Sequence, residues 1–295
     1  MSGVVAVPPS RRQGAASAPV SSSTRGGSLA AYRWEVVKLL AQVKTQGTLL
    51  LCLLAPFLFV AALKMQTNTP ADTLFGRWVH DSGFAIPLVV LGFAGQWALP
   101  ALTSVVAGDI FVSEDRHGTW RTILTRSLSR SQLFAGKAFA AMTFSVAATV
   151  VLGLSSLAAG AVLIGRQPVV GLSGSLVEPG RAAVLVVASW ASVLPPVLAF
   201  TALGLLLSVA TRSTAVGIGG PVVLGLLMQL ASLANGPAII RELLVTTPFA
   251  AWHGFWTTPT FTGPFVHGLF VSAGYFVACL AGAYLVLRHR DFTEG

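Results

Sequence analysis

The sequence predicts an all-α integral membrane protein with six transmembrane helices, and two observations lead to this prediction. The first is composition: 54% of the 295 residues are hydrophobic and only 10% are charged, whereas about 25% of the residues of a soluble domain are charged. The second is spacing, because the chain contains uncharged stretches that are long enough for a bilayer, which a helix of roughly 20 apolar residues can cross. These stretches cover 45–63, 82–108, 138–165, 182–211, 213–240 and 243–287.

The chain begins with two segments that we expect outside the bilayer. Residues 1–28 are rich in Ser, Pro, Gly, Ala and Arg and lack the apolar core of a signal peptide, so we predict a disordered cytoplasmic tail. Residues 29–45 favour an amphipathic interfacial helix, because apolar residues recur there at helical spacing while basic residues lie elsewhere on the helical wheel. The apolar positions are Leu29, Tyr32, Val36, Leu40 and Val43. An ordinary cytoplasmic helix packed on a partner is the alternative.

A six-helix transmembrane domain is predicted over 46–287, followed by a cytoplasmic tail at 288–295. The spans are expected at about 46–63, 84–108, 133–164, 182–210, 214–235 and 265–287. Pro195 and Pro196 interrupt the fourth span, which a membrane tolerates only where the helix faces protein or a wet cavity. Arg212 marks a tight turn between spans four and five. The segment 236–264 is apolar but punctuated by Pro and Gly, which favours short external helices before span six.

The basic residues are unevenly distributed, and this distribution predicts the topology. The net charge is +9, and fourteen of the nineteen Lys and Arg residues fall in the two tails and in the inner loops that follow if the N-terminus is cytoplasmic. This is the positive-inside bias. It predicts a multi-pass protein of the cell membrane with both termini cytoplasmic. The basic charge therefore indicates contact with membrane lipids and not with nucleic acid.

The chain offers little for catalysis or for a cofactor. Its five His residues are scattered, and Cys52 and Cys279 fall in predicted spans, where they are expected to be small packing residues. No metal, cofactor or catalytic residue is therefore expected. Lys137 follows "FAG" like the end of a phosphate-binding loop, but the earlier Gly and the following Ser or Thr are missing. We interpret Lys137 as an anchor at the cytoplasmic start of span three.

The densest run of charge is "EDRHGTWRTILTRSLSRSQLFAGK", residues 114–137, between spans two and three. Gly118 can end a short helix. Ser129, with Gln132 three residues later, fits a capping box at the start of the next helix. Acids precede a spaced series of arginines, which makes a surface of both signs. Such a surface suits the docking of a protein, and a solvated loop whose arginines only fix topology is equally compatible with these residues.

The same run resembles the cytoplasmic signature of ATP-binding-cassette type-2 export permeases. The matching positions are Glu114, Gly118, Thr119, Leu124, Arg130, Gly136 and Lys137. The sequence departs from that signature at Ser127 and Leu128, where the family commonly has Pro followed by an apolar residue. A weaker similarity to the helix that precedes span one in that family involves Glu35, Lys38, Leu39, Lys44 and Thr45.

The resemblance implies a permease subunit of an ATP-driven exporter, which forms the translocation pathway and does not hydrolyse ATP itself. It implies two protein partners: a separate ATP-binding subunit and a second permease chain, identical or related. It also implies that the loop after span two couples to the ATP-binding subunit. The coupling residues expected from it and from the charge pattern are Glu114, Asp115, Gly118, Thr119, Arg121, Arg126 and Arg130.

Span six carries small residues at intervals of four, namely Gly274, Ala278 and Gly282. They allow a second helix to approach closely, either within the chain or in a dimer. A membrane assembly or scaffold protein without transport activity shares this predicted topology and is the alternative function. An intramembrane enzyme is the least supported, because the polar residues expected in the spans are too few and too separated to form a site.

Overall fold

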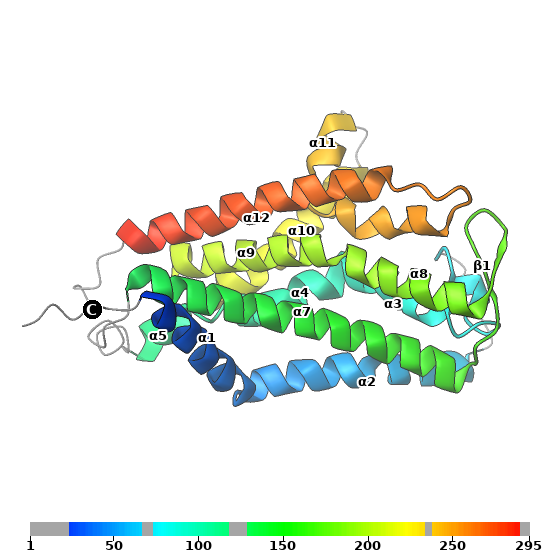
Figure 1. Cartoon of the computed structure of the whole chain (residues 1–295), viewed down its shortest axis with the longest axis horizontal. Coiled ribbons are helices and arrows are strands. Elements are labelled where there is room, and N and C mark those ends of the chain that lie inside the picture. Colours follow the sequence, from blue (N-terminus) through cyan, green and yellow to red (C-terminus); the bar gives the residue numbers. More distant parts are fainter. Residues whose placement is uncertain (1–23, 67–72, 118–128, 234–237, 290–295) are drawn as a thin grey trace, which may run out of the picture.

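The computed structural model describes residues 24–66, 73–117, 129–233 and 238–289 and is almost entirely helical (Figure 1). Within these residues, sheet structure is limited to one antiparallel pair of two-residue strands, β1 (Val169–Val170) and β2 (Leu176–Val177). The predicted all-α class is confirmed. In the same residues, five helical segments are long and apolar enough to cross a membrane.

Those five segments lie over five of the six predicted spans. They are α2 (Val43–Met65), α7 (Arg130–Leu163), the consecutive pair α8 (Pro179–Ser192) and α9 (Leu194–Thr211), α10 (Thr214–Leu233) and α12 (Gly263–His289). The remaining predicted span, the second, is also helical, but it is divided into α3 (Ala85–Phe93), the π-helical segment η2 (Ala94–Ala98) and α4 (Leu99–Ala107). The count of six spans stays a prediction.

The N-terminal helix α1 (Thr24–Leu40) joins α2 at an angle, through Gln42 in an extended conformation (Figure 1). Its buried side consists of Ala31, Glu35 and Leu39, which recur every four residues and so lie on one side of the helix. Trp34 is 74% exposed on the other side. Exposed apolar residues beside Trp are typical of a membrane surface, and the interfacial position of α1 stays a prediction.

The fourth predicted span is interrupted next to its two prolines, as the sequence predicted. Helix α8 ends at Ser192, and α9 begins at Leu194 with Pro195 in its first turn, where the missing N–H would have no helical partner in any case. The pair α8–α9 is also the most enclosed of the five segments, because 61% of its most apolar stretch is buried against 17–44% in the others. This burial agrees with the prediction that the span faces protein or a wet cavity and not lipid on all sides.

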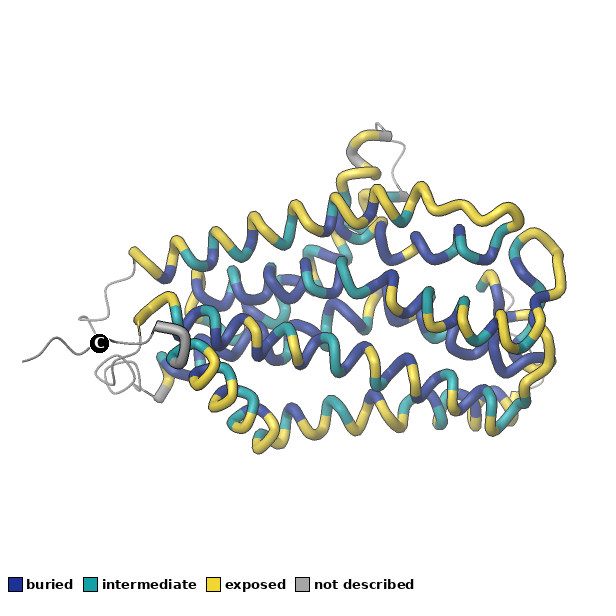
Figure 2. The backbone as a smooth tube through the Cα atoms, viewed as in Figure 1, coloured by how far each residue is buried: buried dark blue, intermediate teal, exposed yellow. Residues whose placement is uncertain are grey.

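Helices α2, α7, α9 and α12 lie side by side in that order in Figure 1, and α4 and α10 pack behind α9. Buried residues follow the inner faces of these helices, and the outer faces of α2 and α12 are largely exposed (Figure 2). Cys52 and Cys279 are both buried and free, as predicted. Arg212, with φ 54°, forms the predicted tight turn between α9 and α10.

The end of the bundle opposite α1 is closed by short elements. These are η1 (Gly76–Trp78), the strands β1 and β2 and the 3₁₀ helix η3 (Thr247–Trp256), whereas α11 (Ala238–Leu243) projects from the side of the bundle near α12 (Figure 1). The backbone N–H of Leu172, in the turn between the strands, donates to the carbonyl oxygen of Trp256 at 2.9 Å. The indole N–H of Trp256 donates to Ser189 Oγ at 3.0 Å, which ties η3 to α8.

Candidate functional site

The predicted coupling residues fall partly within the described chain. Glu114 and Asp115 lie in the short helix α5 (Val112–His117), and Arg130 is the first residue of α7. Four further predicted coupling residues lie outside the described residues: Gly118, Thr119, Arg121 and Arg126. The structure therefore places the two flanks of the charged block.

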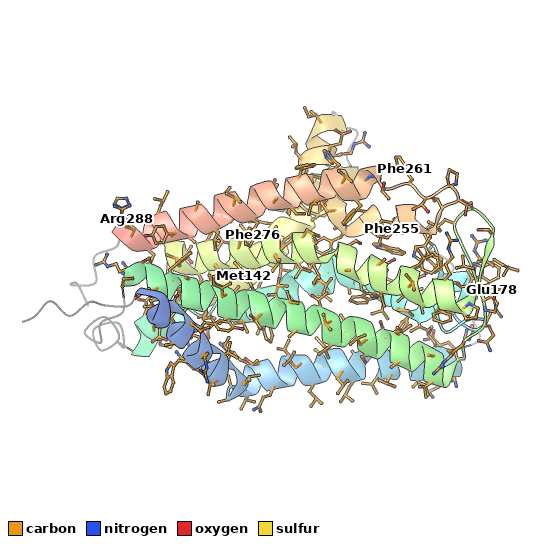
Figure 3. The ribbon with its side chains drawn as sticks, viewed as in Figure 1. Met142, Glu178, Phe255, Phe261, Phe276 and Arg288 are labelled. Atoms are coloured by element: carbon orange, nitrogen blue, oxygen red, sulfur yellow. The ribbon has the colours of Figure 1, made fainter. Side chains whose placement is uncertain are left out.

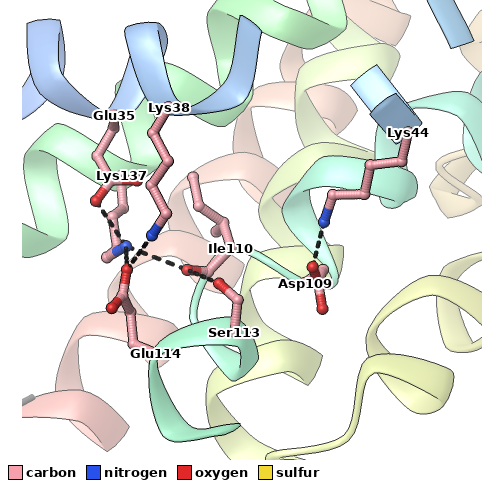
Figure 4. Close-up of polar contacts among 8 residues, drawn as sticks. All are labelled: Glu35, Lys38, Lys44, Asp109, Ile110, Ser113, Glu114 and Lys137. Carbon is pink, nitrogen blue, oxygen red and sulfur yellow. Dashed lines mark hydrogen bonds and ion pairs between the residues drawn. The ribbon is translucent and has the colours of Figure 1, made fainter. Parts of the chain in front are cut away.

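Glu114 is not a surface residue. Its side chain is buried, and its Oε1 accepts a hydrogen bond from Lys137 Nζ at 2.9 Å and pairs with Lys38 (Figure 4). Lys137 Nζ also donates to Glu35 Oε1 at 2.7 Å and to the carbonyl oxygen of Ile110 at 3.2 Å. We call Glu35, Lys38, Glu114 and Lys137 the ion-pair network. It joins α1, α5 and α7.

Lys137 is the centre of the ion-pair network, which corrects its interpretation as a surface anchor. Its side chain is 0% exposed and lies 6.0 Å from the ring centroid of Phe111. Burying an isolated ammonium group is prohibitively unfavourable, but paired charges with hydrogen bonds offset much of that penalty. The network holds two carboxylates and two ammonium groups, so its formal charge is zero.

Close contact between α1 and α7 makes the ion-pair network possible. A Cβ atom added to Gly136 would lie 2.9 Å from the Cβ of Ala31. The absence of a side chain at Gly136 therefore lets α1 approach α7 closely enough for Glu35 to reach Lys137, the next residue along α7.

A second charged cluster lies nearby, centred on Asp109 after the end of α4. Its carboxylate pairs with Lys44 (Figure 4). It also accepts a hydrogen bond from Thr214 Oγ1 at 2.8 Å, and Arg116 lies 3.8 Å away. Burial alone would raise the pKa of the Asp109 carboxyl. The hydrogen bonds from Lys44 and Thr214 and the charges of Lys44 and Arg116 outweigh burial and hold this pKa below its ordinary value.

The Asp109 cluster ties together α2, α5 and the start of α10. Arg116 donates to Thr214 Oγ1 at 2.7 Å, which connects α5 to α10 directly. The backbones of α4 and α10 meet at the same place, because a Cβ atom on Gly108 would lie 2.3 Å from the carbonyl carbon of Gly217. With the ion-pair network, these contacts fix α5 directly to α1, α7 and α10, and Asp109 links it to Lys44 of α2.

The start of α7 matches the prediction. Ser129 Oγ accepts from the backbone N–H of Gln132 at 3.2 Å, and the Gln132 side chain accepts from the backbone N–H of Ser129 at 3.1 Å, so the capping box is confirmed. The Arg130 guanidinium is exposed and donates to the carbonyl oxygen of Arg288 at 3.0 Å. This bond connects the start of α7 to the end of α12.

The small residues of α12 divide between two environments. A Cβ atom on Gly282 would lie 3.4 Å from the Leu206 side chain, so this position packs against α9 within the chain. Gly274 has no such neighbour within 4 Å, and Ala278 is exposed. A contact with a second chain at Gly274 and Ala278 stays a prediction.

A cavity of about 470 Å³ lies toward the opposite end, between α3, α10 and η3. Its lining is mostly apolar and includes four aromatic residues, Phe75, Phe93, Phe249 and Trp252. Gln229, Thr246 and His253 are among its polar residues. Within the described ranges, no group of three His, Cys, Asp or Glu side chains could hold a metal ion.

Sequence reasoning identified Glu114 but assigned it to a docking surface, and it did not connect Glu114 with its partners. The available signal was the scarcity of charge: Glu35, Lys38 and Lys137 are charged residues in or beside apolar helices. Asp109 carried the same signal, because it is the charged residue at the end of the uncharged stretch 82–108.

Comparison with protein-family models identifies a family for this chain. A family model described as ABC-2 family transporter protein matches residues 33–228. No curated protein matches the chain. The matched stretch extends from α1 into α10, so it contains all four residues of the ion-pair network and the whole Asp109 cluster.

Proposed function

Since the chain belongs to the ABC-2 transporter family and is a permease of an ABC transporter, we propose that it exports its substrate using ATP hydrolysed by a separate subunit. The ATP-binding subunit docks on the charged segment that contains α5 and continues to Arg130. Closure of that subunit pushes on the segment, and the push reorients the helices attached to it.

The observation that carries this proposal is the attachment of α5. A docking element transmits force only if it is held rigidly to the helices that must move. Helix α5 has six residues, too few to be stable alone, but Glu114 ties it to Lys38 of α1 and Lys137 of α7. Arg116 ties it to Thr214 at the start of α10. A displacement of α5 therefore acts on several long helices together.

Charge supports placing this end of the bundle in the cytoplasm. Helix α5, the start of α7 and the end of α12 share one end of the molecule (Figure 1). Most of the basic residues belong to segments at this end, as the positive-inside rule requires of a cytoplasmic face. We propose that the protein lies in the cell membrane with both termini inside.

A second permease chain, identical or related, completes the pathway in this proposal. Gly274 and Ala278 provide an exposed strip of α12 where another helix can approach. The aromatic cavity between α3, α10 and η3 favours apolar substrates, because its polar groups are few.

Charge reversal tests the docking assignment. The variant R121E/R130E is expected to lose co-purification with the ATP-binding subunit and to lose stimulation of its ATPase activity, while its helix content is unchanged. The matched control is R166E/R181E, which makes the same charge change at the opposite end, at Arg166 after α7 and at Arg181 in the first turn of α8. Retention of both assembly and stimulation in R121E/R130E would refute the assignment.

Labelling tests the orientation separately. A cysteine at Thr122, in a chain whose Cys52 and Cys279 are replaced by Ala, is expected to resist an impermeant thiol reagent in intact cells and to react after lysis. Reaction in intact cells would place this segment outside and would exclude the docking proposal. Assembly with an ATPase but no transport in reconstituted vesicles would instead favour a scaffold.

A further inference from the structure

A crevice lies between α9 and α12 at the end of the bundle where both helices finish. Its volume is about 460 Å³, and it is lined by Val209, Ala210, Arg212, Leu285, Val286 and His289. Arg288, labelled in Figure 3, lies beside it at the end of α12. This crevice is separate from both the ion-pair network and the aromatic cavity.

The charges around the crevice are all basic in the described part of the chain. Arg212 and His289 line it, and Arg288 precedes His289. Arg130 is held close by its bond to the carbonyl oxygen of Arg288. Within the described residues, the guanidinium groups of Arg212 and Arg288 form no hydrogen bond or ion pair, so both are available to an anion.

The walls of the crevice are apolar and exposed, with Leu285 at 51% and Val286 at 39%. Helix α12 has 27 residues and is therefore about 40 Å long, which exceeds the roughly 30 Å of the hydrocarbon core. Its last turn thus reaches the level of the lipid headgroups, and the turn before it faces acyl chains. Apolar walls with cations directly beyond them match the order of groups along a phospholipid.

We propose that this crevice binds an anionic phospholipid. Its phosphate lies against Arg212 and His289, and the part of an acyl chain nearest the headgroup lies between α9 and α12. A zwitterionic lipid fits less well, because its ammonium group meets the arginines. The carbonyl ends of α9 and α12 repel an anion, so the basic side chains must supply the attraction. Binding therefore depends on Arg212 itself.

Native mass spectrometry of the purified full chain, equilibrated with equal amounts of phosphatidylglycerol and phosphatidylcholine, tests this proposal. The variant R212N removes the charge and keeps a residue type that tolerates the left-handed φ of 54°. It is expected to reduce the ratio of bound phosphatidylglycerol to phosphatidylcholine about fivefold, the effect of one basic residue near a membrane surface. R212K is expected to retain most of the ratio, which separates loss of charge from misfolding.

Two further variants separate the crevice from general attraction. A210W fills the crevice without changing charge and is expected to lose bound phosphatidylglycerol. R33Q removes an exposed charge from α1 and is expected to behave as the unmodified chain. The proposal is overturned if R33Q and R212N lower the ratio equally, if A210W retains the lipid, or if excess inorganic phosphate displaces it. The assay uses the permease alone, so its result is independent of coupling to an ATPase.

Discussion

Replacing Lys137 by Met tests the ion-pair network most directly. The side chain keeps its length but loses the charge, so the buried Glu114 keeps Lys38 as a partner, whereas the buried Glu35 loses the ammonium group that pairs with its Oε1. Removing one partner from a buried ion pair costs about 3–5 kcal/mol, mainly because the other charge stays buried without compensation. At 2–4 °C per kcal/mol for chains of comparable size, we expect Tm to fall on the order of 10 °C.

The assay is thermal unfolding of the purified protein in detergent, followed by the fraction that still elutes as a monodisperse peak after heating. Lys64→Met is the matched control, because Lys64 is an exposed lysine in the last turn of α2. A surface substitution of this kind changes stability by less than about 0.5 kcal/mol, so its Tm is expected to stay close to that of the unmodified protein.

A compensating variant makes the test specific to charge. K137M/E35Q removes one ammonium group and one carboxylate, which leaves the neutral pair of Lys38 and Glu114. We expect this double variant to recover more than half of the decrease in Tm that K137M causes. If K137M had the same Tm as Lys64→Met, or if K137M/E35Q were no more stable than K137M, the ion-pair network would not stabilise this end of the bundle.

Four further predictions concern single positions. Gly136→Ala should destabilise the protein by forcing α1 away from α7. Gly47→Ala should instead stabilise α2 by up to about 1 kcal/mol, because its added Cβ meets nothing within 4 Å. Equal Tm values for the two variants would contradict this prediction. Ser129→Ala removes the capping box and should cost about 1 kcal/mol, measured as a lower Tm. Asp109→Asn should lower Tm at neutral pH. Because folding lowers the pKa of Asp109, the stability contributed by its carboxylate is present above the ordinary pKa of 3.8 and is lost as pH falls through the folded-state pKa. The Tm values of the unmodified protein and of Asp109→Asn should therefore converge in acid. A difference in Tm that does not change with pH would contradict this prediction. Gly274→Leu should weaken cross-linking between permease chains, and unchanged cross-linking would exclude this strip as the contact.

Features with a local cause could be predicted from the sequence. The adjacent Pro195 and Pro196 favour an interruption of the helix where they lie, because proline lacks the N–H that continues the helical hydrogen bonds. Ser129 and Gln132 satisfy each other's backbone groups across one turn. Arg212 is the single charged residue between two apolar stretches, and this pattern predicted a tight turn between two spans. None of these depends on residues far along the chain.

The division of the second predicted span could not be predicted. A π-helical segment shifts the backbone hydrogen bonds by one residue and has no compositional signature. Residues 94–98 are as uncharged as their neighbours, and Gln96 is the one amide side chain among them. Hydropathy therefore predicted one helix where the structure has three consecutive segments.

The environment of Lys137 was equally hidden, because its partner Glu35 is 102 residues away in the chain. A charge near the predicted end of a span usually reaches toward water, and that expectation made Lys137 an anchor. Only the close packing of α1 on α7 at Gly136 reverses it. The resemblance to the permease signature had marked Glu35, Glu114 and Lys137 separately, without indicating that they meet.

The burial of Glu114 divides the predicted coupling residues into two roles. A carboxylate that is 3% exposed and shared by two lysines cannot also make a principal contact with another subunit. We infer that Glu114 positions α5 and that the exposed arginines, Arg130 among them, meet the ATP-binding subunit. Ion pairs suit the positioning of α5, because a shift of α5 by one helical turn, about 5.4 Å, would separate buried charges. An apolar contact would allow the same shift. Glu114→Gln should therefore uncouple ATP hydrolysis from transport while the ATP-binding subunit stays bound. If the subunit dissociated from E114Q as it does from R121E/R130E, Glu114 would belong to the contact itself.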